Sequence, residues 1–269
     1  MRSQESGLED LNVAERGDGP RVVVWLHGFL GSGSEFLPFA ESLTGRFRSL
    51  LVDLPGHGAS PIGEQTSYEG WSGRIRDAVD QRGLKRFDLI GYSMGGRVAL
   101  DFALRYPGRV RRLVLESTNP GIVDSAARRH RFTSDTLRAD RLRSNGLDAF
   151  LKQWYGYGVF ADLRTQPDTV GALLERRKLN RDSDVARVLR DLSPGNQPSH
   201  WKHLPGLSMP SLMIAGERDG KYRSISIRAA CQSGSIRRVT VPGVGHNVHM
   251  GAPDTYLAIV RRFLEGRVI

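Results

Sequence analysis

The sequence predicts an α/β fold, a mostly parallel sheet covered by helices on both faces and carrying a helical insertion. Two observations indicate this class: short apolar runs alternate with amphipathic stretches of helical length, and one long interval has helical patterns without a convincing strand. A chain of 269 residues can bury one large core but is short for two independent domains.

Six segments have the apolar composition of buried strands, at residues 21–26, 49–53, 87–91, 110–115, 211–215 and 236–241. Strands this apolar are typical of a parallel sheet covered on both faces. Helix-length segments lie between most of them or close the chain, at residues 34–43, 68–82, 94–106, 224–231 and 253–265. This alternation predicts helices on both faces of one sheet, and the crossovers between parallel strands should be right-handed.

The interval 119–207 breaks this alternation. It lies between two strand candidates and contains arginine-rich helical patterns at residues 126–144, 147–155 and 166–177. We therefore expect a helical lid at the carboxyl edge of the sheet, with residues 1–118 and 208–269 forming the core.

The composition limits where and how the protein works. No apolar stretch approaches the roughly 20 residues of a membrane helix, and the first residues lack the apolar segment of a signal peptide, so we expect a cytoplasmic protein without membrane insertion. Cys231 is the only cysteine, which excludes an intramolecular disulfide and a cysteine-rich zinc site.

The charge balance is strongly basic, with a net charge of +10, and 34 of the 39 basic residues are arginines. Arginine binds both phosphates and carboxylates, so charge alone leaves nucleic acid and an anionic small substrate open. The basic residues are scattered and no nucleic-acid motif is present. We therefore expect a small anionic substrate and no nucleic-acid partner, while the sequence does not indicate an oligomeric partner.

The stretch Gly91-Tyr92-Ser93-Met94-Gly95 has the form G-x-S-x-G. A strand candidate precedes it and a helix candidate follows, which is the context of a nucleophile elbow, where the serine lies on a strained strand-to-helix turn. The alternative is a packing turn whose serine merely caps the helix.

A serine needs a histidine that takes its proton and an acid that orients the histidine. Among seven histidines, His246 lies in a loop between the last strand candidate and the final helix, at the same sheet edge as Ser93, and His249 is its nearest competitor. Asp219 follows the strand candidate 211–215 and is the expected acid, with Glu217 as the less favoured alternative.

An oxyanion site needs backbone N–H groups aimed at developing negative charge. Met94, directly after the serine, is expected to supply one donor, and Phe29, after the strand candidate 21–26, the other. We interpret His27 as a brace of the Phe29 loop, and Asp53 and His57 as scaffold of a turn.

Together these motifs resemble the α/β-hydrolase superfamily over nearly the whole chain. A narrower set resembles the 2-succinyl-6-hydroxy-2,4-cyclohexadiene-1-carboxylate synthases, the MenH enzymes of menaquinone biosynthesis. Its discriminating members are Arg97 after the elbow, the stretch 116–121 with arginines behind it, Trp154-Tyr155 and Gln197-Pro198.

The resemblance implies an α/β-hydrolase fold and a lyase of menaquinone or phylloquinone biosynthesis, without a metal or organic cofactor. Such an enzyme eliminates pyruvate from 2-succinyl-5-enolpyruvyl-6-hydroxy-3-cyclohexene-1-carboxylate. By the same resemblance Ser93 is the base, His246 and Asp219 raise its basicity, and the oxyanion site holds the enolate.

The implied substrate carries three carboxylates, which bidentate arginines hold and orient. Arg97 lies one helical turn beyond Ser93 and can approach the pocket. The resemblance also carries substrate-binding roles to Tyr92, Arg131, Trp154 and Arg177, although the sequence after Arg177 departs from the asparagine-rich family pattern. Phe160 matches a pocket aromatic of the family and could equally belong to the lid core.

A serine hydrolase, either a carboxylesterase or a carbon–carbon bond hydrolase, could use the same triad. Its pocket should be mostly apolar, whereas the synthase should show several arginines converging near Ser93. A non-catalytic binding protein on this fold is disfavoured by the intact set of triad residues.

Overall fold

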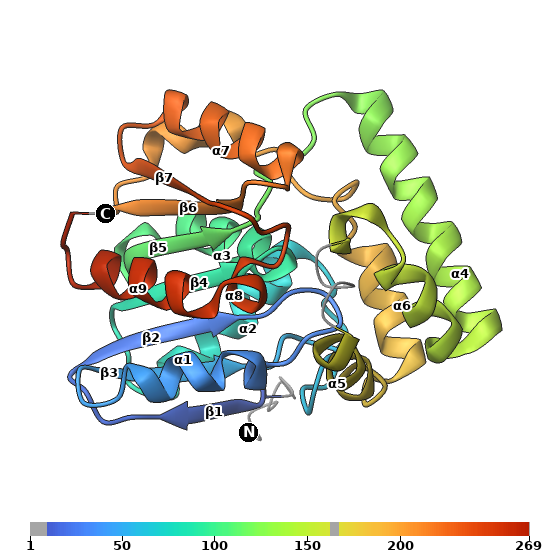
Figure 1. Ribbon diagram of the computed structural model, residues 1–269, viewed down its shortest axis with the longest axis horizontal. Coiled ribbons are helices and arrows are strands. Elements are labelled where there is room, and N and C mark those ends of the chain that lie inside the picture. Colours follow the sequence, from blue (N-terminus) through green and yellow to red (C-terminus); the bar gives the residue numbers. More distant parts are fainter. Residues whose placement is uncertain (1–9, 162–166, 269) are drawn as a thin grey trace, which may run out of the picture.

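The computed structural model describes residues 10–161 and 167–268. Within them, seven strands form one sheet in the order β1-β3-β2-β4-β5-β6-β7 (Figure 1). The strands are β1 (Val13–Arg16), β2 (Arg21–Leu26), β3 (Phe47–Val52), β4 (Phe87–Tyr92), β5 (Val110–Glu116), β6 (Ser211–Gly216) and β7 (Ile236–Val241). The six predicted strands are confirmed to within about two residues at each end.

All neighbouring strands pair in parallel except β1, which is antiparallel to β3 at the sheet edge. β1 is not among the predicted strands. It has four residues, none of them fully buried, so it lacks the apolar run by which the central strands were recognised.

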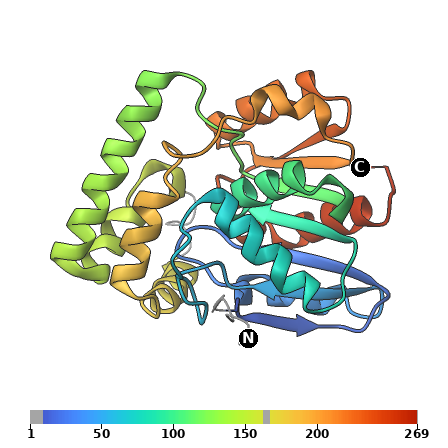
Figure 2. The ribbon, with the colours of Figure 1, turned by 180° about the vertical axis from the view of Figure 1, so that it is seen from behind.

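Helices cover both faces of the sheet, as predicted. One face carries α2 (Tyr68–Asp80), α3 (Met94–Arg105) and α7 (Gly220–Gln232), which lie nearest the viewer in Figure 2. The other face carries α1 (Leu37–Ser42), α8 (Val248–Gly251) and α9 (Pro253–Leu264). Each layer of helices closes its own apolar core against the sheet, with Trp71 and Phe102 on the first face and Trp25 and Tyr256 on the second.

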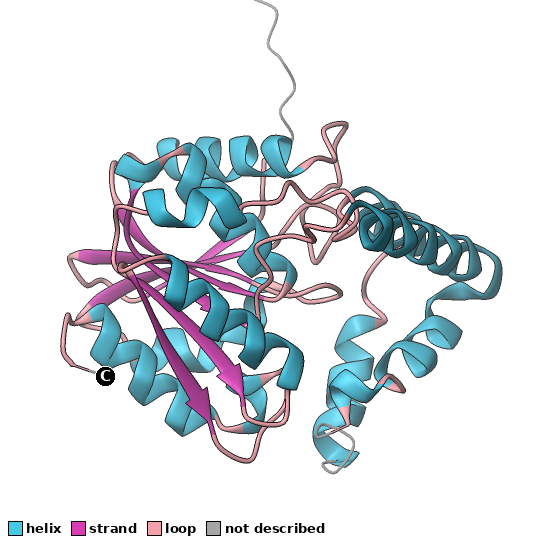
Figure 3. Ribbon diagram, turned by 90° about the horizontal axis from the view of Figure 1, so that it is seen from above, coloured by secondary structure: helices cyan, strands magenta, loops and turns pink. Residues whose placement is uncertain are grey.

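The described part of the interval 119–207, between β5 and β6, contains the α-helices α4 (Ser125–Tyr155), α5 (Pro167–Arg177) and α6 (Asp182–Asp191). They stand to one side of the sheet and its flanking helices (Figure 3). Gly146 interrupts α4 with φ 79° and ψ 166°, between the two helices that the sequence predicts there. The predicted first residue of the third helix, Gln166, lies outside the described residues.

α6 is not predicted from the sequence, although its buried residues Val185, Ala186, Val188 and Leu189 have helical spacing. These side chains join a third apolar cluster formed mainly by α4, α5 and α6. Leu30, from the loop after β2, inserts into the same cluster. None of the helices in the described ranges is long and apolar enough to cross a membrane.

Candidate active site

Ser93 lies between β4 and α3 with φ 50° and ψ −104°, a strained conformation for a residue with a side chain. Small neighbours make the turn possible: a Cβ on Gly91 would lie 2.5 Å from the carbonyl oxygen of Gly95, and a Cβ on Gly95 would lie 2.3 Å from that of Leu26. The Ser93 N–H donates to the Glu116 carbonyl at 2.9 Å. The local sequence thus folds into the predicted strand–turn–helix and presents the serine at the sheet edge.

The structure brings Ser93, His246 and Asp219 together. Nε2 of His246 lies 3.0 Å from Oγ of Ser93, and Nδ1 lies 2.6 Å from Oδ2 of Asp219. Both His246 and Asp219 are buried, and the Tyr222 ring lies 4.6 Å from the imidazole. With Nδ1–H donating to the carboxylate, Nε2 is free to accept the serine proton.

The two competing residues are engaged elsewhere. Nδ1 of His249 lies 2.8 Å from Oε2 of Glu116. Glu116 also accepts from the N–H groups of Val248 and His249 through Oε1, at 2.7 Å and 3.0 Å. Glu217 accepts from the Gly243 N–H at 2.9 Å. Glu116 therefore fixes the loop that carries His246, a role that the sequence did not indicate.

The loop after β2 places Phe29 beside the serine. His27 is fully buried, and burial lowers its pKa, which favours a neutral ring. In that state Nδ1–H donates to the Gly28 carbonyl at 2.7 Å, while Nε2 accepts from the Leu54 N–H at 2.9 Å. Phe29 and Met94 both line the cavity at Ser93, where their backbone N–H groups are the candidate oxyanion donors.

Asp53 and His57 lie outside the lining of that cavity. Asp53 accepts from the N–H groups of Gly33 and Ala59, at 2.7 Å and 3.0 Å. Their contacts are those of a turn scaffold.

A cavity of about 670 Å³ opens at Ser93, between the carboxyl edge of the sheet and the helices α4 to α6. This volume is typical of a small-molecule site. Trp154 and Tyr92 line it; Trp154 contacts Phe29 edge to face at 5.1 Å, and Tyr92 packs 5.6 Å from His246. Phe160 belongs both to the cavity wall and to the third apolar cluster. Among the residues that the structure describes, no group of three His, Cys, Asp or Glu side chains could hold a metal ion.

Several cations line this cavity, among them Arg97, Arg131, Arg138, Arg177 and Lys221. Arg97 is buried, and its Nη1 donates to the Leu192 carbonyl at 2.8 Å and to the Tyr68 hydroxyl. Both acceptors are neutral. Nε and Nη2 of Arg97 have no protein partner among the described residues, so one edge of a buried guanidinium is available to an anion.

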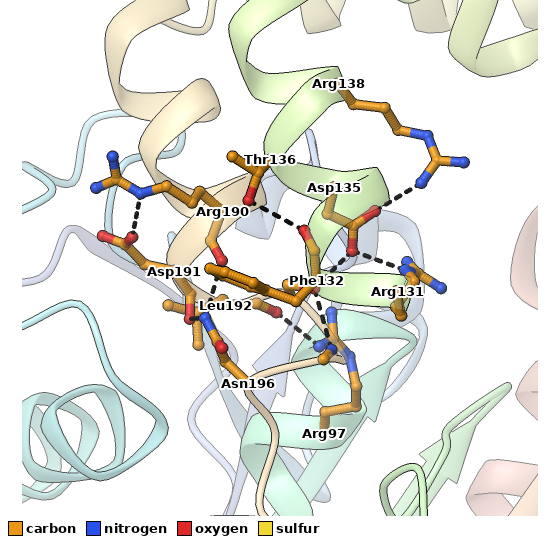
Figure 4. Close-up of polar contacts among 12 residues, drawn as sticks. Arg97, Arg131, Phe132, Asp135, Thr136, Arg138, Arg190, Asp191, Leu192 and Asn196 are labelled. Carbon is orange, nitrogen blue, oxygen red and sulfur yellow. Dashed lines mark hydrogen bonds and ion pairs between the residues drawn. The ribbon is translucent and has the colours of Figure 1, made fainter. Parts of the chain in front are cut away.

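Asp135 holds two of the other arginines (Figure 4). This carboxylate is fully buried and accepts from Nε of Arg131, Nη1 of Arg138 and Oγ of Ser193, each at 2.7 Å. Arg131 uses only Nε in this contact, and its two terminal nitrogens have no partner in residues 10–161 and 167–268. The Asp135 carboxylate therefore orients both arginines on α4 and links α4 to Ser193, in the segment after α6.

Arg177 lines the same cavity but is more fully engaged. It donates to the Tyr155 hydroxyl at 3.0 Å, to the Leu30 carbonyl at 2.9 Å, and to Glu35 in a buried ion pair. The charge of Arg177 lowers the pKa of Glu35, although burial alone would raise it.

Lys221 was missed by the sequence reading. It lies two residues after Asp219, at the start of α7, and this position at the carboxyl edge was the available signal. Its side chain remains exposed at the cavity; partial burial lowers its pKa, and the positive charges of Arg131 and Arg97 lower it further. Its ammonium lies 5.3 Å from the Tyr222 ring centroid.

Comparison with known proteins supports one family. Residues 21–253 match the family model described as alpha/beta hydrolase fold. The chain is 37% identical over 254 residues to 2-succinyl-6-hydroxy-2,4-cyclohexadiene-1-carboxylate synthase of Yersinia enterocolitica, covering 94% of this chain and 89% of that protein.

Two further comparisons agree. The chain is 34% identical over 271 residues to the chloroplastic protein PHYLLO of Arabidopsis thaliana, covering 94% of this chain but only 16% of PHYLLO. The solved structure of MenH from S. aureus superposes with a TM-score of 0.90 at 29% identity, covering 96% of this chain and 98% of that chain.

Proposed function

The chain belongs to the α/β-hydrolase fold family and, within it, to the 2-succinyl-6-hydroxy-2,4-cyclohexadiene-1-carboxylate synthases, and on this premise we propose that it is a lyase. It eliminates pyruvate from 2-succinyl-5-enolpyruvyl-6-hydroxy-3-cyclohexene-1-carboxylate in menaquinone or phylloquinone biosynthesis. The observation that carries the proposal is the combination of an assembled Ser–His–Asp site with a cavity lined by several cations.

The change from a 3-cyclohexene to a 2,4-cyclohexadiene defines the bonds involved. A proton leaves ring carbon C2, next to the succinyl ketone, and its electrons form an enolate whose charge lies on the ketone oxygen. When the ketone re-forms, these electrons form the C2–C3 double bond, the original double bond shifts to C4–C5, and the C5–O bond breaks in the same step. The enolate of pyruvate leaves and is protonated to pyruvate. The reaction is therefore a base-catalysed elimination and consumes no water.

Ser93 is the proposed base. Its Oγ takes the C2 proton while its own proton passes to Nε2 of His246, 3.0 Å away. Asp219, 2.6 Å from Nδ1, stabilises the imidazolium that forms. The negative charge that develops on the ketone oxygen is stabilised by the N–H groups of Phe29 and Met94, and such donors typically contribute about 3–4 kcal/mol each.

The three carboxylates of this substrate match the charge of the cavity. We assign carboxylate binding to Arg97, which lines the cavity and whose Nε and Nη2 have no partner among the described residues, and to Arg131, which engages only Nε with Asp135. Lys221 adds a third cation at the sheet side of the cavity. Trp154 and Tyr92 form walls that hold the ring.

The interval 119–207 is proposed to act as the lid, with 1–118 and 208–269 as the core. The lid supplies Arg131 and Trp154 to the cavity, so it contributes binding groups as well as shielding the enolate from water.

The test is to supply the purified protein with the enolpyruvyl substrate and follow pyruvate and diene formation together. We expect saturable formation of both in equal amounts, and loss of most of this activity in Ser93→Ala, which keeps the wild-type circular dichroism spectrum. Cleavage of a simple neutral ester without pyruvate release would refute the lyase and favour a serine hydrolase.

A further inference from the structure

The turn that carries Phe29 has an unusual backbone. The Gly31 N–H donates to the Gly28 carbonyl at 3.0 Å, which makes Phe29 and Leu30 the two central residues of a tight turn. Leu30 has φ 69°, at a turn position that favours glycine. Such a conformation persists only where the surroundings hold it.

The helical interval 119–207 holds Leu30 at both its side chain and its carbonyl. The side chain is 1% exposed and packs in the apolar cluster formed mainly by α4, α5 and α6. The carbonyl accepts two hydrogen bonds at 2.9 Å, from Nη1 of Arg177 and from Nδ2 of Asn180. Both donors come from the end of α5 and the connection to α6.

The two donors are themselves fixed. Nδ2 of Asn180 also donates to the Arg177 carbonyl at 2.9 Å. Nε of Arg177 donates to Tyr155, and Nη1 pairs with Glu35 of the core. Arg177 and Glu35 each have 4% side-chain exposure, so the pair is shielded from solvent and a change in either partner would leave a buried charge.

We propose that Arg177 and Asn180 are positioning residues that hold the Phe29–Leu30 turn, so that the lid must dock on the core before the oxyanion site is complete. This rests on the proposed role of the Phe29 N–H as an oxyanion donor. Arg177 then acts through the Leu30 carbonyl instead of binding a substrate carboxylate. Catalysis at Ser93 and closure of the cavity become coupled through a single turn.

The positioning role of Arg177 and Asn180 is tested first without any substrate. Amide hydrogen exchange over residues 28–31 is measured in wild type, Asn180→Ala and the control Leu179→Ala, whose leucine is 80% exposed on the same connection. We expect exchange in this turn to accelerate by about tenfold or more in Asn180→Ala only. Unchanged exchange in Asn180→Ala would overturn the proposal. Because hydrogen exchange needs no catalysis, it distinguishes failure of this positioning role from failure of the proposed lyase activity.

Kinetic measurements then distinguish a residue that positions the Phe29–Leu30 turn from one that binds a substrate carboxylate. Asn180→Ala should lower kcat for pyruvate release by about tenfold or more and change KM by less than about threefold, because an oxyanion donor acts mainly on the transition state. The pair Arg177→Met with Glu35→Gln removes both charges together and limits misfolding; it should also lower kcat. A tenfold rise of KM at unchanged kcat in that double variant would overturn the proposal and make Arg177 an anchor.

Discussion

Replacing Arg97 by methionine tests whether a buried guanidinium anchors a substrate carboxylate. The fold should survive this change, because within the described part of the chain Arg97 donates only to two neutral oxygens. The Tyr68 hydroxyl keeps its own hydrogen bond of 3.0 Å to the Leu192 carbonyl, so no buried acceptor is left without a partner. The expected loss of stability is about 1 kcal/mol.

The effect on catalysis should be much larger. A hydrogen bond to a charged group contributes about 1.5–3 kcal/mol, and each 1.36 kcal/mol is a factor of about ten in rate. Losing the Arg97 contact should therefore lower kcat/KM for pyruvate release by roughly 10- to 150-fold. A neutral ester that reaches Ser93 has no carboxylate to lose, so its turnover should change by less than about threefold.

The assay compares kcat/KM for both substrates in wild type, Arg97→Met and Arg16→Met. Arg16 is an exposed residue of β1, outside the lining of the cavity, and serves as the charge-matched control. Equal losses on both substrates would indicate a distorted elbow, because Arg97 lies on the elbow helix. Wild-type kcat/KM for pyruvate release would refute its role as anchor.

Three other changes follow from the charges in and around the cavity. Lys221→Met removes a cation from the cavity lining and should raise KM for the tricarboxylate substrate about tenfold. An unchanged KM would contradict its proposed contact with a substrate carboxylate. Asp135→Asn should lower the free energy of unfolding, measured in urea, by about 1–2 kcal/mol. The loss is smaller than for a fully buried ion pair because Arg131 and Arg138 are partly exposed. An unchanged unfolding midpoint would contradict the role of Asp135 in holding these arginines. Burial lowers the pKa of His57 below its usual 6.5. The free energy of unfolding should therefore fall as the pH drops below about 6.5 towards the folded pKa. His57→Gln should make this dependence on pH weaker, and an unchanged dependence would contradict a buried neutral His57.

Local sequence patterns predicted most of the fold. Apolar runs predicted the six parallel strands, and the G-x-S-x-G turn with its flanks predicted the strained Ser93. Position after β6 and β7 was enough to select Asp219 and His246, because parallel strands bring their carboxyl ends to one edge. The short strand β1 was not predicted because it lacks an apolar run, whereas α6 was not predicted although its four buried apolar residues have helical spacing.

Long-range polar partners could not be predicted. Nothing local pairs Arg177 with Glu35, which lies 142 positions away, and the sequence cannot indicate that Asn180 donates to the Leu30 carbonyl. Asp135 is spaced four residues from Arg131, a helical pairing that periodicity could have indicated. Which of the many arginines keep a free edge depends on such tertiary contacts.

The most direct test of the central claim, that Ser93 is a base in an elimination, is a single-turnover experiment with deuterium at ring carbon C2 of the substrate. Single turnover observes the chemical step without product release. We expect pyruvate and diene to form together, more slowly from the deuterated substrate, with no covalent adduct on Ser93 in intact-protein mass spectra. Equal rates for both substrates together with an acyl adduct on Ser93 would contradict the proposed mechanism.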